Sequence, residues 1–239
     1  MANIKKHIPN FITCCNLLSG CAGVVMAFQG NLVVAAALIW LGAMFDFFDG
    51  FVARWLLSYS DIGKELDSLA DMVTFGVLPG CILFMLIQMH TDIIWLPFLA
   101  FSLTSFSALR LAKFNTDTRQ SVDFIGLATP AMAIFVSGLP YIQHETLLIP
   151  STPWLLVVIG FGLSILMVSE ITLFSLKITG LSWKTNWYKY MLLISAIPLM
   201  ALWGASALPV IIIIYILLSV FFHKAENSMG HYTKSKNAD

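Results

Sequence analysis

The chain has 239 residues, of which 59% are hydrophobic and 11% charged, and its 13 basic and 13 acidic side chains give a formal net charge of zero. Soluble domains carry about 25% charged residues, so this composition excludes an ordinary soluble protein, and the balanced charge argues against a nucleic-acid partner. Several apolar runs approach the roughly 20 residues that a helix needs to cross a bilayer, which predicts an all-α polytopic membrane protein.

Glycines, prolines and polar clusters divide the sequence into about eight predicted membrane spans. In chain order these spans cover residues 11–28, 31–57, 63–89, 92–112, 127–143, 153–174, 190–205 and 207–222. The last two spans are short, so six spans followed by a re-entrant pair is an alternative that the sequence leaves open.

The basic side chains all fall on one side of the membrane in this arrangement. They lie before the first span, at the 2–3, 4–5 and 6–7 connections and in the tail: Lys5, Lys6, Arg54, Lys64, Arg110, Lys113, Arg119, Lys177, Lys184, Lys189, Lys224, Lys234 and Lys236. By the positive-inside rule, both termini are expected in the cytoplasm. Residues 1–10 mix basic and apolar side chains, so they either lie along the membrane interface or form an ordinary charged flank.

Four aspartates surround the turn between the second and third spans. Asp46 and Asp49 are three residues apart, and Asp67 and Asp71 are four apart, so each pair projects from one face of its helix. At ~1.5 Å of rise per residue, Asp49 and Asp71 both lie roughly 16 Å from the turn. If the two faces meet, four carboxylates converge in one pocket toward the cytoplasmic side.

Such a cluster requires either protonation of some carboxyl groups or neutralisation by cations. A site made only of oxygen ligands favours Mg²⁺, Mn²⁺ or Ca²⁺. A proton relay or ion pathway would also use acids at membrane depth. A cytoplasmic surface loop is a third interpretation, but it would expel the mostly apolar stretch 44–57 from the membrane.

Small residues accompany the acids. Gly50 and Ala53 are three residues apart and leave a groove beside Asp49, and Gly63 lies four residues before Asp67. Small residues on a helix face let a neighbouring backbone or a ligand approach closely. Ordinary helix packing would explain any one of them taken alone.

Together these residues form one pattern: Asp46-x-x-Asp49-Gly50-x-x-Ala53-Arg54, eight residues, then Gly63-x-x-x-Asp67-x-x-x-Asp71. The pattern resembles the signature of the CDP-alcohol phosphotransferase family at every defined position. The resemblance implies a six-helix catalytic core, extended here by two C-terminal spans. It also implies a transferase that attacks a CDP-linked lipid with an alcohol and releases CMP, with two divalent cations per site and usually a homodimer.

The resemblance further implies a role for each matching residue. The four aspartates would bind the metals, either Mg²⁺ or Mn²⁺ with Ca²⁺ as a further candidate, and Asp71 would double as the general base. Gly50, Ala53, Arg54 and Gly63 would line the CDP groove. A snorkelling interfacial cation is the alternative interpretation of Arg54.

Three more stretches resemble the phosphatidylserine synthase branch of that family. They are IPNFITCCNLLSG (8–20), DSLADMVTFGVLPG (67–80) and RLAKFNTDTRQSVDFIGLATPA (110–131). They imply CDP-diacylglycerol and L-serine as substrates and phosphatidylserine as product. One departure is visible, because Ala128 stands where that branch usually has proline.

Cationic side chains near the cytoplasmic mouth agree with a zwitterionic acceptor, whose carboxylate suits the planar fork of arginine. Arg110, Lys113, Asn115 and Arg119 are therefore candidate serine or phosphate contacts. For each cation, simple topology-setting charge is the alternative.

Weaker candidates lie on the first span, where Asn10, Thr13 and Asn16 could contact nucleotide or substrate. Helix-capping or interface roles are equally compatible with those residue types. Glu170, near the cytoplasmic end of the sixth span, is expected to snorkel to the membrane interface. Joining a substrate site and pairing with a neighbouring cation are the alternatives.

We expect one transmembrane catalytic domain over residues 1–223, with its core over about 11–174, extra spans over about 190–222 and a polar cytoplasmic tail at 224–239. The lipid tails of the donor would stay in the bilayer, which is the inner membrane in a bacterium, and the site would face the cytoplasm. Glycerol phosphate or an inositol phosphate as acceptor would keep the same chemistry. A cation or proton transporter is the rival from another class, although the internal repeat typical of many transporters is absent from the sequence.

Overall fold

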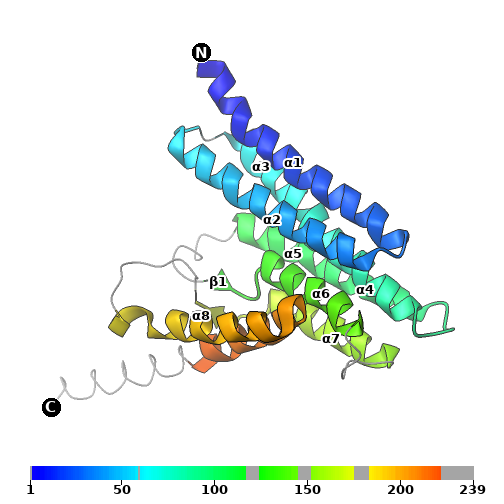
Figure 1. Cartoon of the computed structure of the whole chain (residues 1–239). Coiled ribbons are helices and arrows are strands. Elements are labelled where there is room, and N and C mark those ends of the chain that lie inside the picture. Colours follow the sequence, from blue (N-terminus) through cyan, green and yellow to red (C-terminus); the bar gives the residue numbers. More distant parts are fainter. Residues whose placement is uncertain (1, 59, 117–123, 145–151, 175–182, 222–239) are drawn as a thin grey trace.

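The computed structural model describes residues 2–58, 60–116, 124–144, 152–174 and 183–221 (Figure 1). Almost all of these residues are helical. The elements are α1 (Ala2–Phe28), α2 (Leu32–Trp55), α3 (Asp61–Asp71), the π-helix η1 (Met72–Val77), α4 (Leu78–Gln88), the 3₁₀-helix η2 (Leu96–Phe101), α5 (Ser102–Thr116), β1 (Phe124–Ile125), α6 (Thr129–His144), α7 (Pro153–Val168), β2 (Thr172–Leu173), α8 (Trp183–Trp203) and the 3₁₀-helix η3 (Gly204–Ala207). A final helix covers residues 208–221.

Within the described residues, four helical segments are long and apolar enough to cross a bilayer: His7–Phe28, Leu32–Trp55, Asp61–Gln88 and Asn186–Phe221, the last of which contains the 3₁₀-helix η3. Two shorter apolar helices, Thr129–Ile142 and Pro153–Val168, accompany them. The prediction of a helical integral membrane protein is thereby confirmed. The total of about eight spans and the cytoplasmic location of both termini stay predictions.

Three predicted boundaries are wrong. The helix expected over 92–112 begins only at Ser102, because turns follow Gln88 and a 3₁₀-helix starts beside Pro97, whose missing N–H suits a first turn. The helix expected to end at 174 ends at Val168, and Thr172–Leu173 then pairs antiparallel with Phe124–Ile125. The seventh predicted span begins at Trp183 instead of 190. The two short strands are the only β-structure within the described ranges.

Helices α1, α2 and the continuous α3–η1–α4 segment lie side by side (Figure 1). Two glycines allow these helices to approach each other closely at Thr74 of η1. A Cβ placed on Gly20 would lie 2.5 Å from Thr74 Oγ1, and one on Gly42 would lie 2.4 Å from Thr74 Cγ2. Only glycine permits this approach without moving a helix. The three helices therefore meet just beyond the predicted carboxylate site.

The π-helix η1 begins directly after Asp71. Leu78 donates its N–H to the Val73 carbonyl, five residues back, instead of the usual four. In a regular α-helix the Pro79 ring would crowd the Phe75 carbonyl, and proline cannot donate the matching hydrogen bond. The wider turn relieves that conflict, and Thr104 Oγ1 donates to the Gly76 carbonyl at 3.1 Å.

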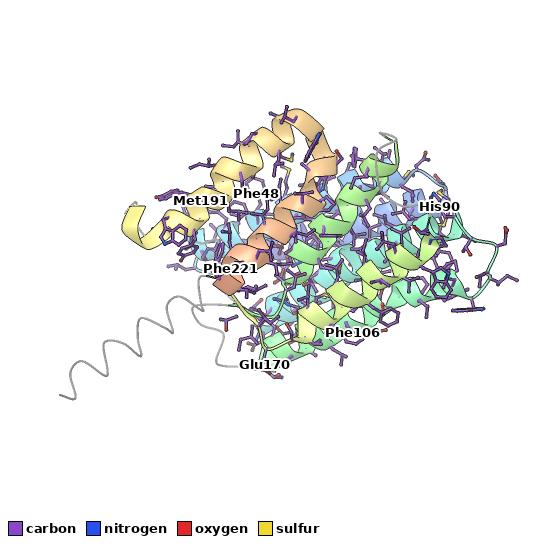
Figure 2. The ribbon with its side chains drawn as sticks, turned by 90° about the horizontal axis from the view of Figure 1, so that it is seen from below. Phe48, His90, Phe106, Glu170, Met191 and Phe221 are labelled. Atoms are coloured by element: carbon purple, nitrogen blue, oxygen red, sulfur yellow. The ribbon has the colours of Figure 1, made fainter. Side chains whose placement is uncertain are left out.

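The C-terminal part of the structure is an antiparallel hairpin of α8 and the final helix, packed beside α6 (Figure 2). Pro209 occupies the space that a side chain at Gly138 would need. Tyr215 Oη donates to the Phe174 carbonyl at 3.0 Å, and the Phe174 ring makes edge contacts with Tyr188 and Tyr215. This aromatic cluster joins the hairpin to the strand that follows α7.

Candidate active site

The carboxylates gather where α2 and α3 face each other. One carboxylate oxygen from each of Asp46, Asp49 and Asp67 lies within 4.8 Å of the other two. The Asp49 residue is only 6% exposed. The helix faces predicted from the sequence spacing therefore do meet. Asp71 stands one turn further along α3, within electrostatic range of the other three acids.

The chemistry of this cluster fits a divalent cation. The Asp67 Oδ1 atom is buried and has no hydrogen-bond partner within the described part of the chain. In the same part, no lysine or arginine forms an ion pair with any of the four aspartates. Buried carboxylates without compensation are strongly unfavourable, and an all-oxygen donor set matches the preference of Mg²⁺, Mn²⁺ and Ca²⁺.

Helix α1 supplies two hydrogen bonds to the acids. Thr13 Oγ1 donates to Asp49 Oδ2 at 2.7 Å, and Asn16 Nδ2 donates to Asp71 Oδ1 at 3.2 Å. Both α1 residues are buried, with exposures of 3% and 0%. From the sequence, both residues are weaker candidates for contact with nucleotide or substrate. In the structure both side chains donate to carboxylates.

A pocket of about 200 Å³ opens beside the cluster, between α1, α2 and the start of α3. Its lining consists of Pro9, Asn10, Thr13, Asp49, Gly50, Ala53, Ser58, Ser60, Gly63, Lys64 and Asp67. Three residues of the predicted CDP groove, Gly50, Ala53 and Gly63, are among them, as is the candidate Asn10. Arg54 is exposed and lies outside this lining, although its guanidinium reaches back over Gly50.

Sequence reasoning missed the polar contribution of the turn before α3. Ser58, Ser60 and Lys64 line the pocket, and the Ser58 hydroxyl is buried without a partner within the described residues. Ser60 Oγ accepts the Gly63 N–H at 3.0 Å and so caps α3. A serine followed by Asp61 is a recognisable helix start, and that signal would have identified Ser60 as the residue that caps α3.

Two candidate acceptor contacts on α5 lie close to the acids. Arg110 is 7% exposed, its Nη1 donates to Thr129 Oγ1 at 3.4 Å, and its Nε is buried without a partner among the described groups. Arg110 is within electrostatic range of Asp71. Asn115 Nδ2 donates to Ser68 Oγ, between Asp67 and Asp71, at 2.8 Å.

The other two acceptor candidates stand apart. Lys113 Nζ pairs with Glu170 Oε1 at 3.0 Å, and the two side chains are 40% and 68% exposed. Figure 2 shows Glu170 at the edge of the molecule, beyond the end of α7. Pairing with a neighbouring cation is thus the alternative that the structure shows for Glu170. Arg119 lies outside the described residues.

Comparisons with known proteins agree with this geometry. A family model described as CDP-alcohol phosphatidyltransferase matches residues 6–168. A Bacillus subtilis protein named CDP-diacylglycerol–serine O-phosphatidyltransferase is 36% identical over 172 residues, which cover 70% of this chain and 89% of that protein. A Mycobacterium leprae protein of the same name is 34% identical over 173 residues, covering 69% of this chain and 57% of that protein.

A Methanothermobacter thermautotrophicus protein named archaetidylserine synthase is 31% identical over 146 residues, covering 58% of this chain and 61% of that protein. The chain thus spans less than two thirds of the Mycobacterium and Methanothermobacter relatives, and most of the Bacillus relative. The family model covers more than half of the chain and contains all four aspartates. With its carboxylate cluster, adjoining pocket and matching relatives, the chain belongs to the CDP-alcohol phosphatidyltransferase family.

Proposed function

We propose that this membrane enzyme transfers the phosphatidyl group of CDP-diacylglycerol to the hydroxyl of L-serine, giving phosphatidylserine and CMP. The observation that carries the proposal is the three-carboxylate group beside a pocket lined by Gly50, Ala53 and Gly63. The names of the Bacillus and Mycobacterium relatives support serine as the acceptor.

The reaction is a single displacement in this proposal. The serine oxygen attacks the phosphorus that bears diacylglycerol, the bond from that phosphorus to the oxygen of the CMP moiety breaks, and the serine proton passes to Asp71. An alcohol is a weak nucleophile at neutral pH, so a carboxylate in hydrogen-bond reach assists its attack. Gly50, Ala53 and Gly63 leave room for the nucleotide, and Arg54 lies beside that groove.

Asp46, Asp49, Asp67 and Asp71 are the residues that would hold two divalent cations, either Mg²⁺ or Mn²⁺. When bound, the cations neutralise the diphosphate and the charge that develops on departing CMP. The unpartnered Asp67 Oδ1 and the lack of an ion pair to the cluster within the described residues support this assignment.

Arg110 is the strongest of the proposed serine contacts. Its guanidinium is buried, its Nε has no partner among the described groups, and it is within electrostatic range of Asp71. A serine carboxylate would satisfy such a planar donor. Asn115, Lys113 and Arg119 are proposed as further serine or phosphate contacts at the same mouth.

The proposal also fixes an arrangement in the membrane. In this arrangement about eight spans bring both termini and the active site to the cytoplasmic face, which the segregation of the basic residues in the sequence supports. Residues 1–223 form one transmembrane domain, residues 224–239 form the tail, and two chains form a homodimer. A site at this depth lets the acyl chains remain in lipid while soluble serine enters from water.

Release of CMP by the purified protein tests the reaction. CDP-diacylglycerol in detergent micelles is supplied with Mn²⁺ or Mg²⁺ and with L-serine, glycerol phosphate or an inositol phosphate, and lipid products are identified by mass spectrometry. Asp71→Asn is compared with Glu65→Gln, which neutralises an exposed acid on the same helix.

Serine-dependent CMP release that Asp71→Asn abolishes and Glu65→Gln preserves is the expected result. Release with a phosphorylated alcohol instead of serine would overturn the acceptor assignment while keeping the chemistry. Folded protein that releases no CMP with any acceptor and metal would overturn the enzymatic proposal.

A further inference from the structure

A row of three buried polar residues follows one face of α1. Thr13, Asn16 and Ser19 are spaced three residues apart, with exposures of 3%, 0% and 5%. All three donate hydrogen bonds toward the helices opposite, but to different kinds of acceptor. Thr13 and Asn16 donate to the Asp49 and Asp71 carboxylates, whereas Ser19 Oγ donates to the Leu38 main-chain carbonyl at 2.8 Å.

We propose that Thr13 and Asn16 are positioning residues, which hold the Asp49 and Asp71 carboxylates in the orientation that cation binding and proton transfer require. The inference rests on the proposed function, because it assigns those two acids to the reaction. It differs from the expectation drawn from the sequence, in which Thr13 and Asn16 contact nucleotide or substrate directly.

The Thr13 hydroxyl has two acceptors within reach. Its Oγ1 lies 2.7 Å from Asp49 Oδ2 and 3.1 Å from the Pro9 carbonyl one turn earlier on α1. A hydroxyl has one proton, and a charged acceptor at the shorter distance makes the stronger bond. The bond fixes Oδ2 of Asp49 and so restricts rotation of this carboxylate, one oxygen of which lies within 4.8 Å of oxygens of Asp46 and Asp67.

Asn16 is held in place from several sides. Its main-chain carbonyl accepts the Thr74 hydroxyl at 3.0 Å, and a Cβ on Gly42 would lie 2.9 Å from its Oδ1. That Oδ1 is buried and has no partner among the described groups. An unsatisfied buried amide oxygen is destabilising, so packing alone would favour an apolar side chain here. The Nδ2 bond to Asp71 supplies a reason for an amide.

Groups that orient metal-binding side chains have a measurable effect on the metal. Their loss weakens metal affinity or activity by about tenfold to a hundredfold. Thr13→Val removes the hydroxyl while keeping the branched shape, and Thr13→Ser keeps the hydroxyl. Asn16→Leu removes the donor to Asp71 with little change in volume. Ser19→Ala is the matched control, since it deletes a hydrogen bond from the same face of α1 without touching a carboxylate.

The experiment measures Mn²⁺ binding to the full-length protein in detergent, from the electron paramagnetic resonance signal of free Mn²⁺. CMP release as a function of Mn²⁺ concentration is recorded in parallel. We expect Thr13→Val and Asn16→Leu to weaken Mn²⁺ binding about tenfold or more. Thr13→Ser and Ser19→Ala should bind Mn²⁺ like the unmodified chain. Excess Mn²⁺ should restore part of the Thr13→Val activity.

A double-mutant comparison separates positioning from general weakening of the fold. In an Asp49→Asn background, Thr13→Val should have no further effect on Mn²⁺ binding, because its target carboxylate is gone. The proposal is overturned if Thr13→Val binds Mn²⁺ normally, or if Ser19→Ala weakens binding equally. If Thr13→Val does not fold, Thr13→Ala replaces it in the same comparisons. An unmodified chain that binds Mn²⁺ but releases no CMP would instead count against the proposed function alone.

Discussion

Asn115 Nδ2 donates a 2.8 Å hydrogen bond to Ser68 Oγ, and this bond joins the end of α5 to the turn of α3 that carries Asp67 and Asp71. The two residues are 47 positions apart along the chain. A candidate serine contact is thus hydrogen-bonded to the helix that carries two of the candidate metal ligands.

Asn115→Ala should lower kcat/KM for serine by about tenfold, because a part-buried Ser68 hydroxyl loses its donor. The KM for CDP-diacylglycerol should change little, since neither Asn115 nor Ser68 lines the pocket proposed for the nucleotide. Steady-state kinetics with each substrate varied in turn measure both quantities. Thr116→Ala, which removes an exposed hydroxyl from the next position, is the control. Equal losses for both substrates would contradict this division of the site.

Gly50→Ala should impair nucleotide binding without destabilising the fold. A Cβ at Gly50 would meet its nearest side-chain atom, Arg54 Nη1, at an ordinary 3.7 Å, and alanine is favoured over glycine in a helix by roughly 1 kcal/mol. The added methyl would instead occupy the pocket. We expect an unchanged or higher melting temperature and a KM for CDP-diacylglycerol raised about tenfold, as for a misplaced substrate. A lower melting temperature would point to packing as the role of Gly50.

Gly20→Ala, unlike Gly50→Ala, should destabilise the fold. Its Cβ would lie 2.5 Å from Thr74 Oγ1 and 2.9 Å from the Thr74 Cα, so α1 and η1 would have to separate. Overpacking of this kind typically destabilises by about 1–3 kcal/mol, more than the helix propensity of alanine restores. Thermal unfolding in detergent measures the loss. Gly162→Ala on α7, where a Cβ meets nothing within 4 Å, should leave the melting temperature unchanged or slightly higher.

Arg110→Lys keeps the charge but removes the forked donor. Lysine cannot reproduce both the Nη1 bond to Thr129 and a second donor at the Nε position. The KM for serine should rise about tenfold or more, and the KM for CDP-diacylglycerol serves as the internal reference in the same assay. A selective rise in the KM for CDP-diacylglycerol would move Arg110 to the nucleotide side of the site.

The site was largely predictable because its residues lie on two helices joined by a short turn. Spacings of three and four residues fix a shared helix face, and the structure brings Asp46, Asp49 and Asp67 together as that spacing requires. The groove residues Gly50, Ala53 and Gly63 follow from the same local geometry. The roles of these side chains in catalysis stay predictions until they are measured.

Features that depend on distant partners were not predictable. The Thr13 hydroxyl finds Asp49 36 positions away, and no local pattern selects that acceptor over the Pro9 carbonyl. The apolar run up to residue 174 predicts that the sixth span continues to that point. In the structure the helix ends at Val168, and Thr172–Leu173 instead pairs with Phe124–Ile125. The late start of α5 likewise follows from turns and a 3₁₀-helix that apolar composition does not distinguish from a membrane span.

The π-helix after Asp71 divides the third long helix, α3–η1–α4, into two halves whose side chains point in different directions around the helix axis. An α-helix turns by about 100° per residue, so the extra residue accommodated in Met72–Val77 offsets the carboxylate-bearing half from the half that carries the buried Leu78 and Ile82. Shortening η1 by one residue would rotate Asp67 and Asp71 away from α1 and α2, although every acid remained in the sequence. The distance along the chain from these acids to Pro79 is therefore as much a determinant of the site as the acids themselves.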